Sequence, residues 1–547
     1  MEKPFVVFSI FWVLVFIVFL PAAKAGMVAD YPYYIDWYRQ NNFWGFINIK
    51  NSTALYHTAA LTLYIMIKLF GSNPWAWHLV YVTMHAINGL LFYLFFKQLL
   101  HDSDVNNGTL LSFIAVCFFI ICPHASEVVI WEPSSHYLVA ICIILSIMLL
   151  LQKFLRTQKP LYVIIACLLF FYSSFSHEFF YLTPWFSLVL ICYYYFSLGL
   201  NKALFKKAIF GFFIPLLLLF ILHLVLLRIF KHTYVSHFGT LIQYPLVHYL
   251  SVPLKYVYHV IFLGRYFPFE TRNKIYSFCE TKTAISIFYG GVVCFWGYVA
   301  FRFKNISRKL KVVALVTVYL MTTYLFLSPV YFPDSQLVCY DRYIYPSAGF
   351  AFLLIVLLVS FIKVRWLAGL ILCCYGLLNG WFTTKVNIYW KQSAYVISRL
   401  LNNFPDPGNK TVLLLNLPDD LNGIPMISAQ DEGRFKTMNN MLTNHPLNNK
   451  IYDVVAYKMS TMEDGVHVIV INDSMLHVKL NQWGSWWMYG LLGASGYENA
   501  DYKVNIADAG SWYELAIKHP ASQYLMLYQV GSQWRVVDWD KKNVDQY

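Results

Sequence analysis

Charged residues are scarce in this sequence of 547 amino acids, in which Asp, Glu, Lys and Arg together make up 13%. Soluble domains carry about 25% charged residues. Hydrophobic residues reach 59%, aromatic residues reach 19%, and the mean hydropathy is +0.51. This composition excludes an ordinary soluble protein and predicts a polytopic α-helical membrane protein.

Several motifs of other chemistries are absent. The ten cysteines form no C-x-x-C pair and none follows residue 374, which excludes a disulfide or cysteine-zinc framework in the C-terminal part. Cys279 and Cys339 fall in expected external loops, where they could pair. No H-E-x-x-H sequence and no nucleophile elbow occurs. His124 and Glu127 could share a helical face but lack a third ligand by spacing, so we expect no metal site and no cofactor.

The positive charge is distributed unevenly along the chain. Residues 1–384 contain 27 Lys and Arg and 12 Asp and Glu, a net charge of +15, whereas residues 385–547 contain 14 and 16, a net charge of −2. A nucleic-acid-binding protein would carry its positive charge on the soluble part. Because that part is nearly neutral here, we expect no nucleic-acid partner and relate the charge to membrane topology.

Long apolar runs predict eleven transmembrane helices. Five of the loops between them hold fourteen Lys and Arg but only two acidic residues, and the positive-inside rule therefore places these loops in the cytoplasm. The first run ends in "PAAKAG", like a signal peptide, but its length favours a retained helix. The expected spans are residues 5–22, 76–96, 109–122, 135–151, 160–175, 182–199, 208–229, 284–301, 312–328, 344–362 and 366–384.

Two further apolar segments, residues 55–70 and 246–264, are expected to lie at the membrane interface. The C-terminal part changes character, because short runs such as "KTVLLLNLPDD" and "VHVIVIND" are typical of strands that end in turns. The sequence thus predicts a transmembrane domain, residues 1–384, and an extracytoplasmic α/β domain, residues 385–547.

The few acidic residues of the expected external loops lie beside histidine, arginine and aromatic residues at the expected edge of the membrane. Ionisable residues at membrane depth are costly, so that they tend to face a cavity and to be functional. Anchoring of a helix end at the interface is the alternative for any single one. The stretches concerned are "GMVADYPYYIDWYRQNN" with Asp30 and Asp36, "PHASEVVIWEPSSH" with His124 and Glu127, "SSFSHEFFYLTP" with His177 and Glu178, and "VCYDRYIYPS" with Asp341, Arg342 and Tyr343.

These stretches resemble motifs of the GT-C glycosyltransferases. "GSNPWAWHLVYVTMHAINGLLFYLFFKQLL" is similar to an Asn-Pro-Trp-x-x-His-Leu-Val segment of the transmembrane-and-tetratricopeptide-repeat mannosyltransferases, and "PHASEVVIW", "SFSHEFFYLTP" and "YDRYIYPSAGF" follow in the family's order. Eleven spans also match the protein O-mannosyltransferases. Such enzymes transfer a sugar from a polyprenyl or dolichyl phosphate to an acceptor outside the membrane.

The resemblance implies that an acidic residue of the first external loop is the catalytic base, which is Asp30 here, or Asp36 as second choice. A guanidinium would stabilise the leaving phosphate. The chain departs from the family at "ALYHT", where a histidine replaces a guanidinium, and at the Ser-Lys-Glu turn, where a histidine replaces lysine. The expected donor-phosphate ligands are Arg342, Arg265 and His177, and the expected substrate-binding residues are His57, His124, Glu127, Glu178, Asp341 and Tyr343.

Other functions stay open at this point. An oligosaccharyltransferase or ligase would use a lipid-linked oligosaccharide and often a divalent metal. A transporter or flippase would tend to show repeat symmetry and broken helices at mid-membrane, which the sequence lacks. A non-enzymatic assembly protein is the last alternative. The expected location is a bacterial inner membrane with a periplasmic C-terminus, or the endoplasmic reticulum in a eukaryote.

Overall fold

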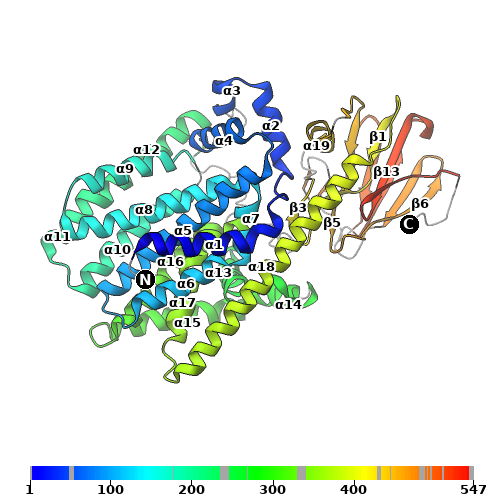
Figure 1. The fold of residues 1–547 in the computed structure, drawn as a ribbon. Helices are drawn as coiled ribbons and strands as arrows, with labels where there is room; N and C mark the ends of the chain where they lie inside the picture. Colours follow the sequence, from blue (N-terminus) through cyan, green and yellow to red (C-terminus); the bar gives the residue numbers. More distant parts are fainter. Residues whose placement is uncertain are drawn as a thin grey trace.

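The chain folds into a helical bundle and a β-rich C-terminal part, which the long helix α18 (Arg365–Asn402) joins (Figure 1). The computed structural model describes residues 3–48, 54–176, 178–233, 245–267, 269–328, 341–427, 433–443, 445–479, 487–488, 491–492, 496–507 and 511–540.

Eight helical segments of the described chain are long and apolar enough to cross a membrane. A ninth is added if α6 (Gly108–Ile120) and the segment Pro123–Ile130, bent by 54°, form one span. The prediction of a multi-pass helical membrane protein is confirmed. The eight are α1 with η1 (Pro4–Ala22), α5 (Pro74–Asp102), η3 with α8 (Glu132–Thr157), η4 with α10 (Glu178–Leu198), α11 to α12 (Lys202–Lys231), α15 (Lys282–Phe301), α16 (Arg308–Leu327) and α18.

The remaining apolar segments form shorter helices. The two other predicted spans are α9 (Leu161–Ser173) and α17 (Tyr345–Val359). The two segments predicted to be interfacial are α4 (His57–Phe70) and α13 (Leu246–Ile261), of which α13 contains Pro253 in its interior. Where these four helices lie relative to the membrane stays a prediction.

Helix α5 packs against α1, α6 and α8 in the bundle. Asn73 caps its N-terminus by accepting hydrogen bonds from backbone N–H groups of the first turn, and Pro74 follows at the first helical position. Gly349 of α17 allows the aromatic ring of Phe92 to pack closely, because a Cβ at this glycine would lie 2.6 Å from the ring. Large aromatic side chains and small residues together fill the interior of the bundle.

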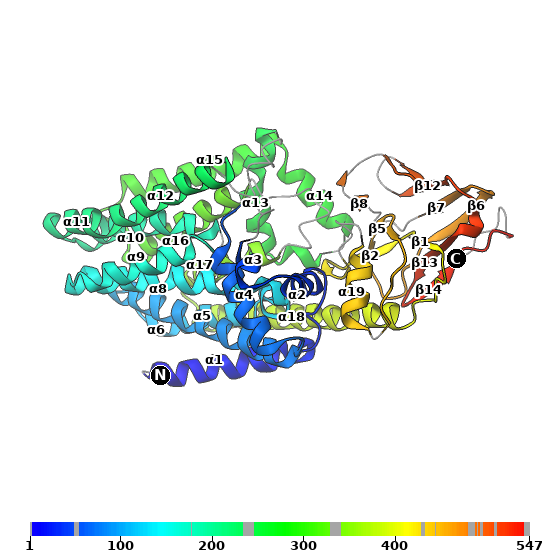
Figure 2. The same ribbon diagram turned by 90° about the horizontal axis from the view of Figure 1, so that it is seen from above.

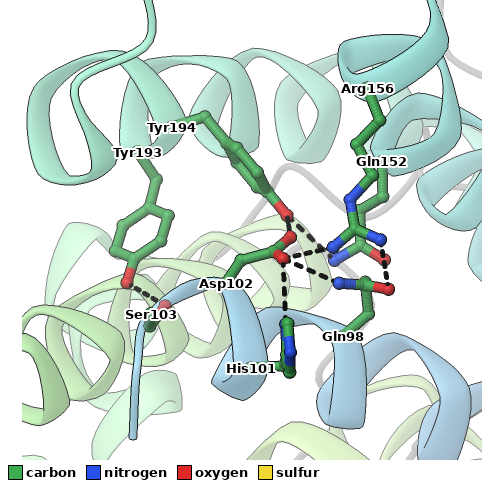
Figure 3. A network of polar contacts seen from close by, with 8 residues as sticks. All are labelled: Gln98, His101, Asp102, Ser103, Gln152, Arg156, Tyr193 and Tyr194. Carbon is green, nitrogen blue, oxygen red and sulfur yellow. Dashed lines mark hydrogen bonds and ion pairs between the residues drawn. The ribbon is translucent and has the colours of Figure 1, made fainter.

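A polar network around Asp102, the last residue of α5, connects α5 with α8 and α10 (Figure 3). Arg156 of α8 forms an ion pair with the Asp102 carboxylate, Tyr194 of α10 donates a hydrogen bond to it, and Gln98 Nε2 donates another at 2.7 Å. Helix α11 (Lys202–Ala208) lies at the end of the bundle away from the C-terminal part (Figure 1), and its Lys207 Nζ donates to Gln158 Oε1, at the end of α8, at 3.0 Å. Three of the basic loops predicted to be cytoplasmic therefore lie together.

The C-terminal part contains three sheets of three or more strands and one α-helix, α19 (Arg434–Leu442), that lies wholly within it among the described residues. In the first sheet, β1 (Thr411–Leu414) pairs in parallel with β13 (Tyr524–Val530) and with β4 (Ile451–Asp453). The strand orders are β14-β13-β1-β4, β10-β11-β12-β7-β6 and β3-β2-β5, and β8 pairs with β9. The other strands are β2 (Leu417–Leu421), β3 (Ile424–Pro425), β5 (Ala456–Met459), β6 (His467–Asn472), β7 (Met475–Lys479), β8 (Trp487–Met488), β9 (Leu491–Leu492), β10 (Gly496–Glu498), β11 (Tyr502–Ile506), β12 (Trp512–Ile517) and β14 (Gln533–Val536).

The C-terminal part docks on the bundle where α19 packs against α2 (Asp30–Gln40) and where α18 contacts β3 (Figures 1 and 2). The backbone N–H of Ala29 donates to the carbonyl of Met426 at 2.8 Å, just before α2 begins. Trp534 Nε1 donates to the carbonyl of Leu400 on α18 at 2.8 Å. The domain boundary predicted at residue 384 lies inside α18, so this helix takes part in both units.

Candidate functional site

An ion pair between Arg342 and Glu127 lies at the end of the bundle that carries α7 (Ser126–Ile130). Arg342 belongs to the short helix η10 (Asp341–Tyr343). Its backbone N–H donates to Glu127 Oε2 at 2.9 Å, and its guanidinium donates to Glu127 Oε1. The side chains are only 5% exposed for Glu127 and 14% for Arg342. The carboxylate therefore fixes both the backbone and the guanidinium of Arg342.

Aromatic rings surround the Arg342 guanidinium. Its central carbon lies 5.2 Å from the ring centre of Trp131 and 5.0 Å from that of Tyr343, within the range of cation–π attraction. Tyr343 in turn packs edge to face against Tyr137 of α8, with 6.0 Å between ring centres. The cation is thus held in a pocket of aromatic side chains that leaves it partly accessible.

Glu178 approaches the same region from a third predicted external loop. It begins η4 (Glu178–Tyr181) and is buried, and its Oε1 accepts a hydrogen bond from the Tyr56 hydroxyl at 2.5 Å. The next residue, Phe179, packs edge to face on Tyr137, with 5.5 Å between ring centres. Tyr137 therefore lies between Phe179 of the Glu178 turn and Tyr343 of the Arg342 turn.

A cavity of about 440 Å³ opens beside Tyr56. His57, the first residue of α4, and Lys231, the last residue of α12 (Ile214–Lys231), supply its nitrogen groups. Phe175 and Phe230 contribute apolar walls. A cationic group among apolar side chains suits a ligand that joins an anionic head to a hydrocarbon chain. The full lining is Ile47, Asn48, Ala54, Leu55, Tyr56, His57, Phe175, Leu226, Phe230 and Lys231.

Asp30 is the first residue of α2 and forms an ion pair with Arg434 of α19. The Arg434 guanidinium also lies 5.6 Å from the ring centre of Tyr33. The indole N–H of Trp131 donates to the carbonyl of Val28 at 3.2 Å, which ties the segment before Asp30 to the ring that contacts Arg342. Asp30 therefore stands where the bundle meets the C-terminal part, and Trp131 connects it with the Arg342 cluster.

Asp36 lies six residues further along the same helix, about 240° around it from Asp30. Its carboxylate accepts a hydrogen bond from Gln40 Nε2 at 2.6 Å, at the exposed surface. Of the two acidic residues of the first predicted external loop, Asp30 thus faces the C-terminal part and Asp36 lies at the exposed surface.

Asp419 of β2 is an acidic group that the sequence analysis did not single out. Burial raises its pKa from 3.8 to about 7, and the neighbouring carboxylate of Asp420 adds to the effect, whereas Lys458 and Arg434 oppose it. Arg434 therefore interacts with acidic groups of both units, Asp30 and Asp419.

His124 and Asp341 meet in a second polar cluster. His124 Nδ1 lies 3.1 Å from Asp341 Oδ1, and His259 Nε2 of α13 lies 3.2 Å from the same oxygen. The side chains are 0–1% exposed. Sequence analysis named His124 and Asp341 separately and missed His259, because that histidine lies in a segment interpreted as interfacial.

Three residues named from the sequence cannot be placed in these clusters. His177 and Cys339 lie outside the described residues, as does the proposed pairing of Cys339 with Cys279. Arg265 lies in η7 (Gly264–Tyr266), where the backbone is described but the side chain is not. Their roles stay predictions. Arg434 and Lys231 were missed because only their contacts with residues far away in the sequence mark them as part of a site.

No protein-family model matches the sequence, and no curated protein matches it. Among solved structures, the chain is similar to the oligosaccharyltransferase of Archaeoglobus fulgidus, crystallised with Zn and sulfate, at 10% sequence identity and a TM-score of 0.36. The match covers 80% of this chain and 62% of the other, so that the chain spans less than two thirds of that protein. A likeness this weak assigns no activity, which has to be inferred from the residues themselves.

Proposed function

We propose that this protein is a GT-C-type membrane glycosyltransferase that moves a sugar from a polyprenyl-phosphate carrier to an extracytoplasmic acceptor, with inversion at the anomeric carbon. The observation that carries the proposal is the Arg342–Glu127 pair and its connection through Trp131 to the segment of Asp30. Trp131 thereby links the fixed cation to the backbone two residues before Asp30, the acidic residue of the first predicted external loop.

In the proposed reaction, the acceptor hydroxyl oxygen attacks the anomeric carbon from the face opposite the phosphate. The bond between that carbon and the phosphate oxygen breaks, and its electron pair leaves with the polyprenyl phosphate. The hydroxyl proton passes to the Asp30 carboxylate and from there to water. General-base catalysis of this kind contributes about 10²–10⁴-fold in rate. The ion pair with Arg434 would orient the carboxylate.

The donor would be bound by charge at its phosphate and by apolar contact along its lipid. Arg342 presents a guanidinium that Glu127 and two aromatic rings hold in place, so little reorganisation is needed when negative charge develops on the leaving phosphate. The cavity beside Tyr56 offers Lys231 and His57 between apolar walls and is our candidate for the lipid-proximal part of the donor. The acceptor would be an extracytoplasmic glycan, lipid or protein.

The proposed orientation follows from the two ends of the bundle. Basic loops lie together at the end around Asp102, and the positive-inside rule assigns them to the cytoplasm. The C-terminal part and Asp30 lie at the other end and would be extracytoplasmic. We therefore propose a bacterial inner membrane with a periplasmic C-terminus, or the endoplasmic reticulum if the host is a eukaryote.

The test is a transfer assay on purified protein with a panel of polyprenyl-phosphate sugars. Asp30→Asn should lower turnover by about 10²-fold or more, while the matched variant Asp36→Asn, the same change on the same helix, should stay close to wild type. Loss of activity in Asp36→Asn alone would move the base to Asp36. Full activity in both variants would refute a base in this loop.

A lipid-linked oligosaccharide ligase or oligosaccharyltransferase is the second candidate. The buried His124, His259 and Asp341 favour it in one respect, because enzymes that use pyrophosphate-linked donors often need a divalent metal, and these residues could hold one. The donor separates the two functions: a ligase would be inactive with every monophosphate sugar and active with a pyrophosphate-linked oligosaccharide.

A further inference from the structure

We propose that His124, His259 and Asp341 bind a single Zn²⁺ ion that holds the Arg342 segment in place. Each residue offers one ligand atom, and the three atoms lie within 4.8 Å of one another. The ligands come from three elements: η2 (Pro123–Ala125), α13 and η10. Because the metal content of the purified protein can be measured without a transfer assay, this inference can fail separately from the proposed function.

Two of the three separations between the ligand atoms match a tetrahedral zinc site, and the third is no more than 4.8 Å. Zinc binds nitrogen and carboxylate oxygen at about 2.0–2.2 Å, so that neighbouring ligand atoms of a tetrahedron lie about 3.3 Å apart. Asp341 Oδ1 lies 3.1 Å from His124 Nδ1 and 3.2 Å from His259 Nε2. An ion could thus be bound with small movements of these side chains, and one position would remain for water.

The second nitrogen of His259 is held in the way expected for a metal ligand. His259 Nδ1 lies 3.1 Å from the hydroxyl of Tyr276, a residue of α14 (Phe269–Cys279) that is fully buried. Histidines that bind metals usually donate this other N–H to an oxygen, which fixes the tautomer and the ring orientation. With Nδ1–H donated to Tyr276, Nε2 carries the lone pair, and a cation between Nε2 and Asp341 Oδ1 would be bound by both atoms.

Burial and charge also favour an ion. The two histidine side chains are 0% exposed and that of Asp341 is 1% exposed, so that the carboxylate has little contact with water. Burying a carboxylate is costly unless it is paired or binds a metal. Both histidine rings contact this carboxylate, and an ion bound among the three groups would compensate its charge. Two imidazoles and one carboxylate are a donor set typical of Zn²⁺, whereas Mg²⁺ and Ca²⁺ prefer oxygen ligands.

The position of the cluster indicates what the ion would do. Asp341 precedes Arg342, so an ion that ties Asp341 to η2 and α13 would fix the turn that carries the guanidinium. His124 lies three residues before Glu127, which binds the Arg342 guanidinium. The three ligands are therefore positioning residues, and the ion would set the geometry of the Arg342–Glu127 pair.

The experiment measures the metal in purified full-length protein after the affinity tag has been removed and weakly bound ions have been taken up by a chelating resin. We expect one zinc per chain in the wild type and its loss in His259→Gln and in Asp341→Asn. His78→Gln, which changes another buried histidine outside this cluster, should keep the zinc. A wild-type protein that retains no transition metal would overturn the proposal.

Cobalt provides a readout that does not depend on the variants folding. Zinc-depleted wild type loaded with Co²⁺ should develop the visible absorption of a tetrahedral cobalt centre with nitrogen and oxygen ligands, and Zn²⁺ should abolish it. An octahedral cobalt spectrum, or zinc that His78→Gln loses as readily as Asp341→Asn, would refute the assignment to these residues. Mg²⁺ should not compete, which separates this site from a general requirement for divalent cations.

Discussion

The substitution Glu127→Gln tests whether the Arg342 guanidinium depends on a buried negative charge. Gln is nearly the same size as Glu and keeps an oxygen that can accept the hydrogen bond from the backbone N–H of Arg342, a bond of 2.9 Å in the wild type. The change therefore removes the charge and leaves most of the packing and the hydrogen bonds in place.

The expected loss of stability in Glu127→Gln is large because the pair is nearly buried: the side chains are 5% exposed for Glu127 and 14% for Arg342. Two unit charges about 4 Å apart interact with about 4 kcal/mol at an effective dielectric constant of 20. Removing one partner of a buried ion pair typically costs about 3–5 kcal/mol. Because the backbone hydrogen bond is retained, we expect a loss near the lower limit, about 3 kcal/mol in the free energy of unfolding.

The assay is denaturation of the detergent-solubilised protein, followed by tryptophan fluorescence, for wild type, Glu127→Gln, Arg342→Met and the double variant. The double variant should lose clearly less stability than the sum of the single variants, since it leaves no unpaired buried charge. The control is Asp104→Asn, which breaks the exposed Arg308–Asp104 pair, 57% and 79% exposed, and should cost less than about 1 kcal/mol. Additive losses in the double variant would show that the two residues do not act as a buried pair.

Three further predictions concern other parts of the molecule. Asp419 has a folded-state pKa of about 7, above the unfolded value of 3.8, so stability should fall as the pH rises from about 4 to about 7, and Asp419→Asn should weaken this dependence in thermal unfolding measured over that range. Lys231→Met should raise the KM for a polyprenyl-phosphate donor with a smaller change in kcat, and an unchanged KM would remove the cavity from the donor site. Gly349→Ala should lower stability by about 1–3 kcal/mol in the denaturation assay, because the added Cβ would lie 2.6 Å from the ring of Phe92, whereas Gly290→Ala, in open space, should not.

The membrane architecture could be predicted because its signals are local. Apolar runs and loop charge identify spans one at a time, and backbone groups in a bilayer have few structural choices besides a helix. The exact helix lengths could not be predicted. The predicted span 109–122 continues after a bend of 54° into α7, and α9 is shorter than the apolar run that predicted it.

The candidate site could be predicted only as separate residues. Glu127 and Arg342 both stood out in the sequence, but they are 215 positions apart and nothing local indicates that they pair. Asp30 and Arg434 are 404 positions apart and lie in different units. His259 gave no signal, since histidines in an amphipathic segment are common and this one contains His248 as well. The roles of the named residues stay predictions that the variants above address.

Helix α18 runs without interruption from the bundle into the C-terminal part and, at 38 residues, is about 57 Å long. Its far end receives the hydrogen bond of Trp534, and the same unit presents Arg434 to Asp30. Because the helix is continuous, each residue added to or removed from it would shift the C-terminal part by about 1.5 Å along the helix axis and turn it by about 100°. The number of residues in α18 thus fixes the rotation of the C-terminal part about the helix axis, and with it which side chain of that part faces Asp30.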